Sequence, residues 1–122
     1  ALAAIDDTNS RTIINDGEIV PGGRAIVFGT KDVKFADEIA SLYYFTLNDR
    51  KLTLLADRQL CSNGKVFTHD ESCLFVCDID TPKKNAVRYR LDILARALLD
   101  ATEILSVRDV PGFPDGMVAA WG

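Results

Sequence analysis

Short apolar runs broken by turn-forming residues extend along most of this chain. Turn sequences at residues 15–17 (NDG) and 21–23 (PGG) are separated and followed by β-branched residues, which predicts a strand, a tight turn and a second strand. Apolar runs at residues 42–47 and 51–55 flank an Asn-Asp turn and predict a hairpin. The pattern therefore predicts an all-β chain of short strands.

The second half of the chain follows the same scheme, with one exception. A turn at residues 63–64 (NG), a polar turn at 69–71 and an apolar run at 74–77 predict another hairpin. In the segment 92–105 the apolar residues instead fall on one helical face; they are Ile93, Leu94, Ala97, Leu98, Ala101 and Leu105. Periodicity and composition alone therefore predict a helix in this segment.

A short polar residue in a glycine-containing turn recurs three times. These residues are Asn15, Asn63 and Asp115, separated by 48 and then 52 positions. A repeat of roughly 50 residues with four short strands is typical of a β-propeller blade, and equivalent positions of successive blades surround one axis. We therefore expect the three side chains to lie close together, where their oxygen atoms suit a hard cation such as Ca²⁺. The alternative is that they only form the turns, which favour Asn and Asp.

Composition narrows the classes of function. The 122 residues fit one domain, and a net charge of −4 argues against a nucleic-acid or anionic-membrane surface, which needs clustered Lys and Arg. No apolar run approaches the roughly 18 residues of a membrane-spanning helix. Three cysteines without a C-x-x-C spacing, Cys61, Cys73 and Cys77, predict reduced thiols and a cytoplasmic protein. The chain begins at Ala1 and has its one methionine at Met117, which predicts a processed chain or a fragment.

The repeated motifs resemble those of the gluconolactonase / regucalcin / luciferin-regenerating-enzyme family. The segments IINDGEIVPGGR, CSNGKVFTHDESCLFVCD and VPGFPDGMVAAWG are similar, in order and spacing, to three successive family motifs. The resemblance implies a six-bladed propeller with one divalent metal in its channel. Residues 1–122 would form one incomplete domain of about two and a half four-stranded blades. It also implies strands at residues 87–91 and 103–107, which leaves only residues 93–101 as a potential helical turn.

The resemblance assigns roles to the three repeated polar residues. Asn63 and Asp115 would be direct metal ligands, and Asn15 would contact the substrate or the metal. Asp115 would also be the general base. The implied metal is Ca²⁺, with Zn²⁺ or Mg²⁺ as alternatives.

Three features depart from the family pattern. The family's further metal ligand, a Glu of the first blade, has no counterpart in this chain. Ile13 stands where the family usually has an Arg that grips a sugar lactone, and Lys31 stands where it usually has a Met. These departures weaken the expectation of a sugar substrate more than the expectation of a metal.

The sequence therefore predicts a divalent-metal-dependent lactone or ester hydrolase of gluconolactonase type, or a fragment of one, acting on a small molecule. The alternative is a non-catalytic, degenerate propeller module that associates with itself or with a partner and binds Ca²⁺ weakly. Either way, a partial propeller leaves a sheet face and strand edges uncovered. We therefore expect self-association or contact with the remainder of a propeller.

Overall fold

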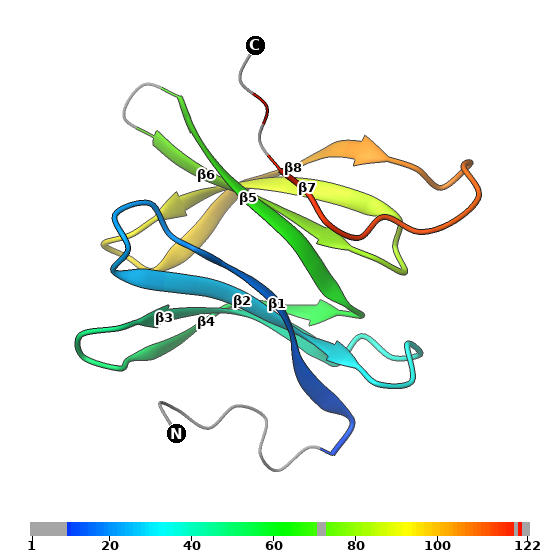
Figure 1. Ribbon diagram of the computed structural model, residues 1–122, viewed down its shortest axis with the longest axis horizontal. Coiled ribbons are helices and arrows are strands. Elements are labelled where there is room, and N and C mark those ends of the chain that lie inside the picture. The colour runs from blue at the N-terminus through cyan, green and yellow to red at the C-terminus, as the bar shows by residue number, and fades with distance from the viewer. Residues whose placement is uncertain (1–9, 71–72, 119, 121–122) are drawn as a thin grey trace.

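Eight strands and no helix make up the part of the chain that the structure describes, residues 10–70, 73–118 and 120 of this computed structural model. The strands form two four-stranded antiparallel sheets, each in chain order (Figure 1). They are β1 (Thr12–Ile19), β2 (Ala25–Asp32), β3 (Ala40–Thr46), β4 (Leu52–Gln59), β5 (Ser62–Asp70), β6 (Cys73–Asp80), β7 (Asn85–Asp92) and β8 (Ala97–Ser106). The all-β prediction is confirmed. Since the described residues form no helix, none of them forms an apolar helix long enough to cross a membrane.

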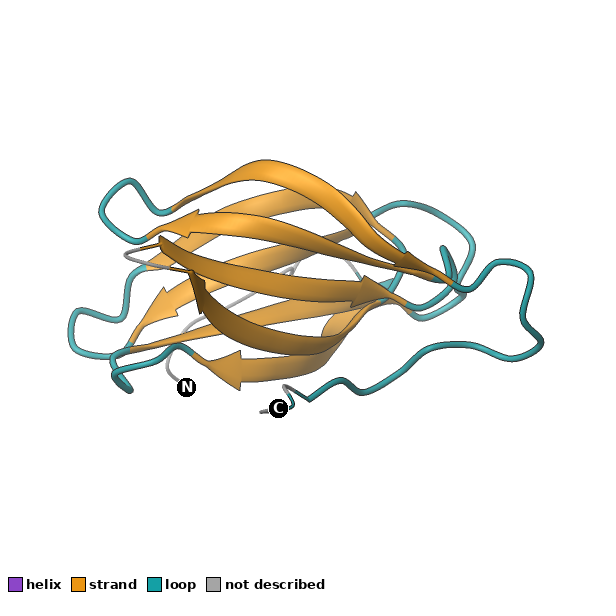
Figure 2. Cartoon of the chain, turned by 90° about the horizontal axis from the view of Figure 1, so that it is seen from above, coloured by secondary structure: helices purple, strands orange, loops and turns teal. Residues whose placement is uncertain are grey.

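The two sheets pack face to face around one apolar core. Side chains of both sheets meet in it: Val20, Ala25, Val27, Leu42, Tyr44, Leu74, Val76 and Leu91. β1 and β5, the first strands of the two sheets, lie against each other, and Figure 2 shows the turns gathered at the two ends of the strands. The ends of β1 and β5 are therefore the places where residues of the two sheets can share a site.

Of the three hairpin turns expected at residues 21–23, 48–49 and 69–71, two form where they are predicted. Residues 20–24 join β1 to β2, and Gly22 and Gly23 adopt φ values of 100° and 73°, which favour glycine. Residues 47–51 join β3 to β4. The third predicted turn is wrong in part, because His69 and Asp70 belong to β5 and pair with Leu74 and Cys73 of β6. The rest of that turn lies outside the described residues.

The prediction of a helix from the periodicity of residues 92–105 is wrong. Residues 93–96 form a turn, and β8 follows and pairs along β7. Two irregularities in this pairing each place one extra residue on β8, and Asp100 at the first of them has a φ of 54°. Each bulge shifts the alternation of inward and outward side chains by one position. Residues 99–106 are all exposed, so the apolar positions of this segment do not mark one buried helical face, and β7 supplies the backbone partners that fix the strand.

The apolar residues 117–121 that follow the PDG sequence predict the beginning of a strand, but the segment after Asp115 begins none within the described residues. Residues 113–118 are irregular, and Figure 1 shows this part of the chain running back beside β5. The backbone N–H of Gly64 donates to the Asp115 carbonyl oxygen at 2.8 Å. The rest of the predicted strand lies partly outside the described residues.

A glycine on β2 allows the two sheets to approach where β5 begins. A Cβ atom built on Gly29 would lie 2.1 Å from Ser62 Cβ and 2.2 Å from Ser62 Oγ. Both distances are far shorter than any van der Waals contact, so no larger residue fits without moving β5. Gly29 thus sets the spacing between the sheets.

A buried ion pair crosses from β5 to β6. Lys65 and Asp78 are opposite each other in the antiparallel ladder, with Lys65 Nζ 3.2 Å from Asp78 Oδ1. Their side chains are 0% and 2% exposed. Gln59 Nε2 donates to Asp78 Oδ2 at 2.8 Å, and the Ser62 hydroxyl donates to Oδ1 at 3.0 Å. Burial raises the pKa of the Asp78 carboxyl, and the Lys65 charge with the two donors opposes that rise.

We expect Lys65→Met to lower the free energy of unfolding by about 3–5 kcal/mol, because it leaves Asp78 as a buried charge without a cation. Adding Asp78→Asn should recover part of the loss, since the buried charge is then removed. Urea unfolding of the single and double variants checks this. If the two single losses simply add in the double variant, the pair makes no contribution of its own.

The stability deficit of Lys65→Met should also depend on pH. With a pKa raised above its usual value of 3.8, the Asp78 carboxyl holds its proton in the folded state at pH values where the unfolded chain has lost it. Stability from this group is therefore present at low pH and lost as the pH rises through the folded-state pKa. The deficit relative to the wild-type chain should be smaller at about pH 4.5 than at about pH 7. A deficit that grows on acidification would contradict a buried, unpaired Asp78.

Gly29→Ala should destabilise the chain by about 1–3 kcal/mol or more, because the added methyl overlaps Ser62. Gly116→Ala is the matched control, since a Cβ there meets no atom within 4 Å. Thermal unfolding of the two variants makes the comparison. Equal midpoints would show that the sheets separate here at no cost.

Candidate metal-binding site

The three polar residues of the repeat come from three segments that lie side by side. Asn15 is on β1, Asn63 is the second residue of β5, and Asp115 lies in the segment beside β5. Asn15 Nδ2 donates to the carbonyl oxygen of Ser62 at 2.8 Å, and Gly64 N–H donates to that of Asp115 at 2.8 Å. Asn15 and Asp115 therefore contact the residues immediately before and after Asn63. Their roles as ligands stay predictions.

Bulges in β1 and β5 set the directions of the Asn15 and Asn63 side chains. The β1–β2 register shifts between Asn15 and Gly17, and Asp16 in between has a φ of 52° with its carboxylate accepting from Gly17 N–H at 2.8 Å. The β5–β6 register shifts between Ser62 and Lys65, which places Asn63 and Gly64 in the second irregularity. Such bulges re-aim side chains beside functional sites. The turn sequences NDG, within β1, and SNG, at the start of β5, are thus bulges rather than hairpin turns.

A glycine next to Asn63 lets the Asp115 segment come close. A Cβ atom on Gly64 would lie 2.4 Å from the Asp115 carbonyl oxygen and 2.7 Å from the Met117 nitrogen. The glycine of the SNG motif is therefore required by backbone contact between β5 and the third motif. This contact, rather than a turn conformation, keeps Asp115 beside Asn63.

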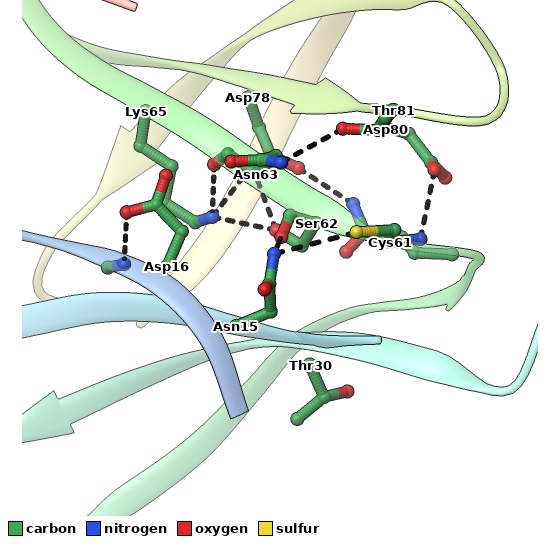
Figure 3. Close-up of polar contacts among 12 residues, drawn as sticks. Asn15, Asp16, Thr30, Cys61, Ser62, Asn63, Lys65, Asp78, Asp80 and Thr81 are labelled. Carbon is green, nitrogen blue, oxygen red and sulfur yellow. Dashed lines mark hydrogen bonds and ion pairs between the residues drawn. The ribbon is translucent and has the colours of Figure 1, made fainter. Parts of the chain in front are cut away.

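The amide group of Asn15 can adopt only one orientation. Its Nδ2 faces the Ser62 carbonyl oxygen at 2.8 Å and Cys61 Sγ at 3.5 Å (Figure 3). A carbonyl oxygen accepts hydrogen bonds and cannot donate, so the NH₂ group must face Ser62. No described residue donates to the Asn15 Oδ1 atom, which therefore remains available as an oxygen ligand.

The amide group of Asn63 is fixed by the same argument through Thr81. Asn63 Nδ2 lies 3.0 Å from Thr81 Oγ1, and that hydroxyl lies 2.9 Å from the Pro114 carbonyl oxygen. Because the hydroxyl has a single proton and gives it to the carbonyl, it can only accept from Asn63. The Asn63 NH₂ group therefore points to Thr81, as in Figure 3, and no described residue donates to its Oδ1 atom.

These atoms form a donor set for a hard, oxygen-preferring cation. Two amide oxygens and the exposed Asp115 carboxylate are the ligand types that Ca²⁺ uses. Within the described residues no three His, Cys, Asp or Glu side chains are grouped to hold a metal ion. The set fits Ca²⁺ by chemistry, but it carries one negative charge, which predicts weak binding.

Lys65 is the centre of a buried hydrogen-bond network next to Asn63 that the sequence did not predict. Lys65 Nζ donates to the Asn63 carbonyl oxygen at 2.6 Å and to Ser62 Oγ at 2.8 Å, in addition to its pairing with Asp78. Lys65 therefore holds the backbone carbonyl of Asn63 and the side-chain hydroxyl of Ser62. A lysine directly after the SNG motif was the one sign in the sequence, and nothing there linked it to Asp78.

The two residues that depart from the family pattern are neighbours in the structure. Ile13 of β1 is opposite Lys31 of β2 in the antiparallel ladder, and Ile13 is about half exposed. Ile13 and Asn15 alternate with Ile14 along β1, so they point to the same face of the strand. The apolar substitution therefore lies beside the candidate site.

Comparison with known proteins adds a family and a fold. The sequence matches the family described as SMP-30/Gluconolactonase/LRE-like region across residues 1–120. A luciferin-regenerating enzyme has a similar fold, with a TM-score of 0.82 at 21% identity. So does regucalcin from Agrobacterium tumefaciens, described as a calcium-binding protein, with a TM-score of 0.80 at 22% identity. Each match covers 94% of this chain and 38% of the other.

A comparison with curated proteins gave no match. The family match, by contrast, spans residues 1–120, a range that contains Asn15, Asn63 and Asp115. The protein therefore belongs to the SMP-30/gluconolactonase/LRE-like family.

Proposed function

We propose that this chain forms part of a divalent-metal-dependent lactone or ester hydrolase. The observation that carries the proposal is the orientation of the two amides: Asn15 and Asn63 both direct their NH₂ groups into the protein. Their carbonyl oxygens are left available beside the segment that carries Asp115. A role in turn formation alone does not explain why the Oδ1 atoms of both Asn15 and Asn63 lack a hydrogen bond from the described residues.

The chain's own groups divide the chemistry in a simple way. A bound divalent cation would polarise the carbonyl group of an ester or lactone. Asn15 and Asn63 would hold that cation as neutral oxygen donors. Asp115 is exposed, so its carboxylate can reach a water molecule, orient it and take its proton.

Ca²⁺ is the metal that we propose. Oxygen donors without thiolate or imidazole favour a hard cation, and the regucalcin with a similar fold is described as calcium-binding. Zn²⁺ and Mg²⁺ are alternatives that a titration separates. Ile13 at the edge of the site offers an apolar surface where a sugar lactone would need a hydrogen-bonding group, so the substrate should be less polar than a sugar lactone.

We further propose that the two sheets are consecutive blades of a six-bladed propeller and that the segment after Asp115 begins a third. The face-to-face packing of two four-stranded antiparallel sheets supports this arrangement. So does the length: the chain spans 38% of each similar structure, close to the share of two and a half blades in six.

A second candidate function is Ca²⁺ binding without turnover, in a module that associates with itself or with a partner. The donor set favours it in one respect, because the described residues hold no group of three or more His, Cys, Asp or Glu side chains that could bind a metal ion. Hydrolysis of a lactone or ester at a rate that depends on Asp115 would decide for the enzyme.

Titration with Ca²⁺ tests the proposed ligands. We expect the wild-type chain to bind with a dissociation constant of about 10⁻⁴ to 10⁻³ M, the range of weak sites. Asp115→Asn should abolish measurable binding, and Asn63→Ala should weaken it several-fold. Isothermal titration calorimetry measures all three.

The controls for this titration are the fold and a nearby carboxylate. Circular dichroism should be unchanged in both variants, because Asp115 is exposed and Asn63 is not part of the apolar core. Asp109→Asn removes an exposed carboxylate from the same segment and should leave binding intact. Equal affinity in wild-type and Asp115→Asn chains would show that the Asp115 carboxylate is no ligand.

The isolated chain should self-associate. Large apolar side chains are exposed on β1 and β8 and in the last segment, among them Ile14 (60%), Ile104 (49%) and Phe113 (70%). In a propeller such surfaces are covered by neighbouring blades. Sedimentation velocity should therefore show dimers or larger species, and Ile14→Ser with Ile104→Ser should shift them toward monomer. Leu94→Ser, in a turn, is the control that should change little, and a compact wild-type monomer would contradict the incomplete propeller.

A further inference from the structure

We propose that Thr81 is the positioning residue of the candidate site, because its hydroxyl holds the Asn63 amide and the Pro114 carbonyl at the same time. Thr81 lies in the turn directly after β6, outside the three sequence motifs. Its role in metal binding rests on the proposed function. Its role in joining β5 to the Asp115 segment rests on the hydrogen bonds alone.

The backbone of Thr81 is tied to the strand that it serves. Thr81 N–H donates to the Cys61 carbonyl oxygen at 3.0 Å. The neighbouring Asp80 carboxylate accepts from the N–H groups of Leu60 and Cys61, each at 3.1 Å. Three hydrogen bonds thus connect the end of β6 to the residues just before Asn63, so the hydroxyl has a fixed position relative to β5.

The hydroxyl then determines which atom of Asn63 faces the site. With its one proton given to Pro114, Thr81 Oγ1 accepts and so selects the NH₂ end of the amide. Without the hydroxyl, Asn63 would lose the partner that distinguishes its nitrogen from its oxygen. The amide could then rotate and present N–H groups, which repel a cation, where the oxygen ligand should be.

The same hydroxyl is one of two ties on the Asp115 segment. Thr81 donates to the carbonyl oxygen of Pro114, and Gly64 N–H donates to that of Asp115, so two successive carbonyls are held. Within the described residues the Asp115 carboxylate itself makes no hydrogen bond or ion pair. Its position is therefore set by the backbone, and the backbone depends on these two bonds.

One side chain thus controls the position of two of the three proposed ligands. Asn15 makes no hydrogen bond to the Thr81 hydroxyl, because its amide is held by the Ser62 carbonyl and by Cys61 Sγ. Loss of the Thr81 hydroxyl should release Asn63 and Asp115 together while leaving Asn15 in place. A residue with a purely structural role in the β6–β7 turn would not couple these two ligands.

The test compares Thr81→Val, which keeps the branched shape without the hydroxyl, with Thr81→Ser, which keeps the hydroxyl. Hydrogen–deuterium exchange without added metal reads the Gly64 amide, whose bond to Asp115 depends on the segment. We expect exchange to become about five- to tenfold faster in Thr81→Val, in keeping with the loss of one hydrogen bond, and to stay within about twofold in Thr81→Ser. Unchanged exchange in Thr81→Val would overturn the coupling.

Calorimetric titration with Ca²⁺ is the second readout. Thr81→Val should weaken binding about five- to tenfold, and Thr81→Ser should restore it to within about twofold of the wild-type affinity. Equal weakening in both variants would overturn the hydroxyl's role. If Thr81→Val does not fold, Thr81→Ala gives the same comparison without the extra methyl. A wild-type chain that binds no Ca²⁺ would overturn the proposed function and the metal role of Thr81, and the exchange data alone would then decide the coupling.

Discussion

The buried ion pair between Lys65 and Asp78 is the interaction on which the arrangement of the candidate site depends. Two charges removed from water are unfavourable unless each finds partners, and here the partners include Ser62 and Asn63, which lie at the candidate site. The Lys65 ammonium group donates to Ser62 Oγ and to the Asn63 carbonyl oxygen. The Asp78 carboxylate accepts hydrogen bonds from Ser62 and Gln59. The need to satisfy both charges therefore fixes the start of β5, where Asn63 lies and where Asn15 finds its own acceptor.

Close backbone approach is the second constraint, and two glycines meet it. Gly29 leaves room for Ser62 between the sheets, and Gly64 leaves room for the Asp115 segment. The first residues of β5 are thus in close contact with β2 on one side and with the Asp115 segment on the other. The proposed site therefore draws on segments whose backbones are in direct contact, so its short amide and carboxylate side chains start from neighbouring positions.

The repeated turn sequences allowed the all-β fold and the neighbourhood of Asn15, Asn63 and Asp115 to be predicted, because a repeat places equivalent residues at equivalent positions. Other features could not be predicted, for physical reasons that differ. The periodicity of residues 92–105 favours a helix, and the strand β8 forms instead because it pairs with β7, which is a contact that the local sequence does not show. Lys65 and Asp78 are 13 residues apart and meet only through the β5–β6 register. Thr81 belongs to no motif, because a hydroxyl at the end of a strand gains its role from the segment that returns to it.

The orientation of the ligands and the charge of the site have separate origins in this protein. The residues that orient the two amides, Ser62 and Thr81, all lie within this chain, so the geometry of the donors does not require anything beyond it. Charge is different. Lys65 and Asp78 neutralise each other, so among the three ligands that we propose only Asp115 brings a negative charge to a divalent cation. The balance must be supplied by an anionic group of the substrate or by a further carboxylate, and the similar structures are long enough to contain one, since this chain spans 38% of their length. The residues of this chain can therefore orient the proposed ligands, while the metal affinity depends on whether a further anionic group is added to the site.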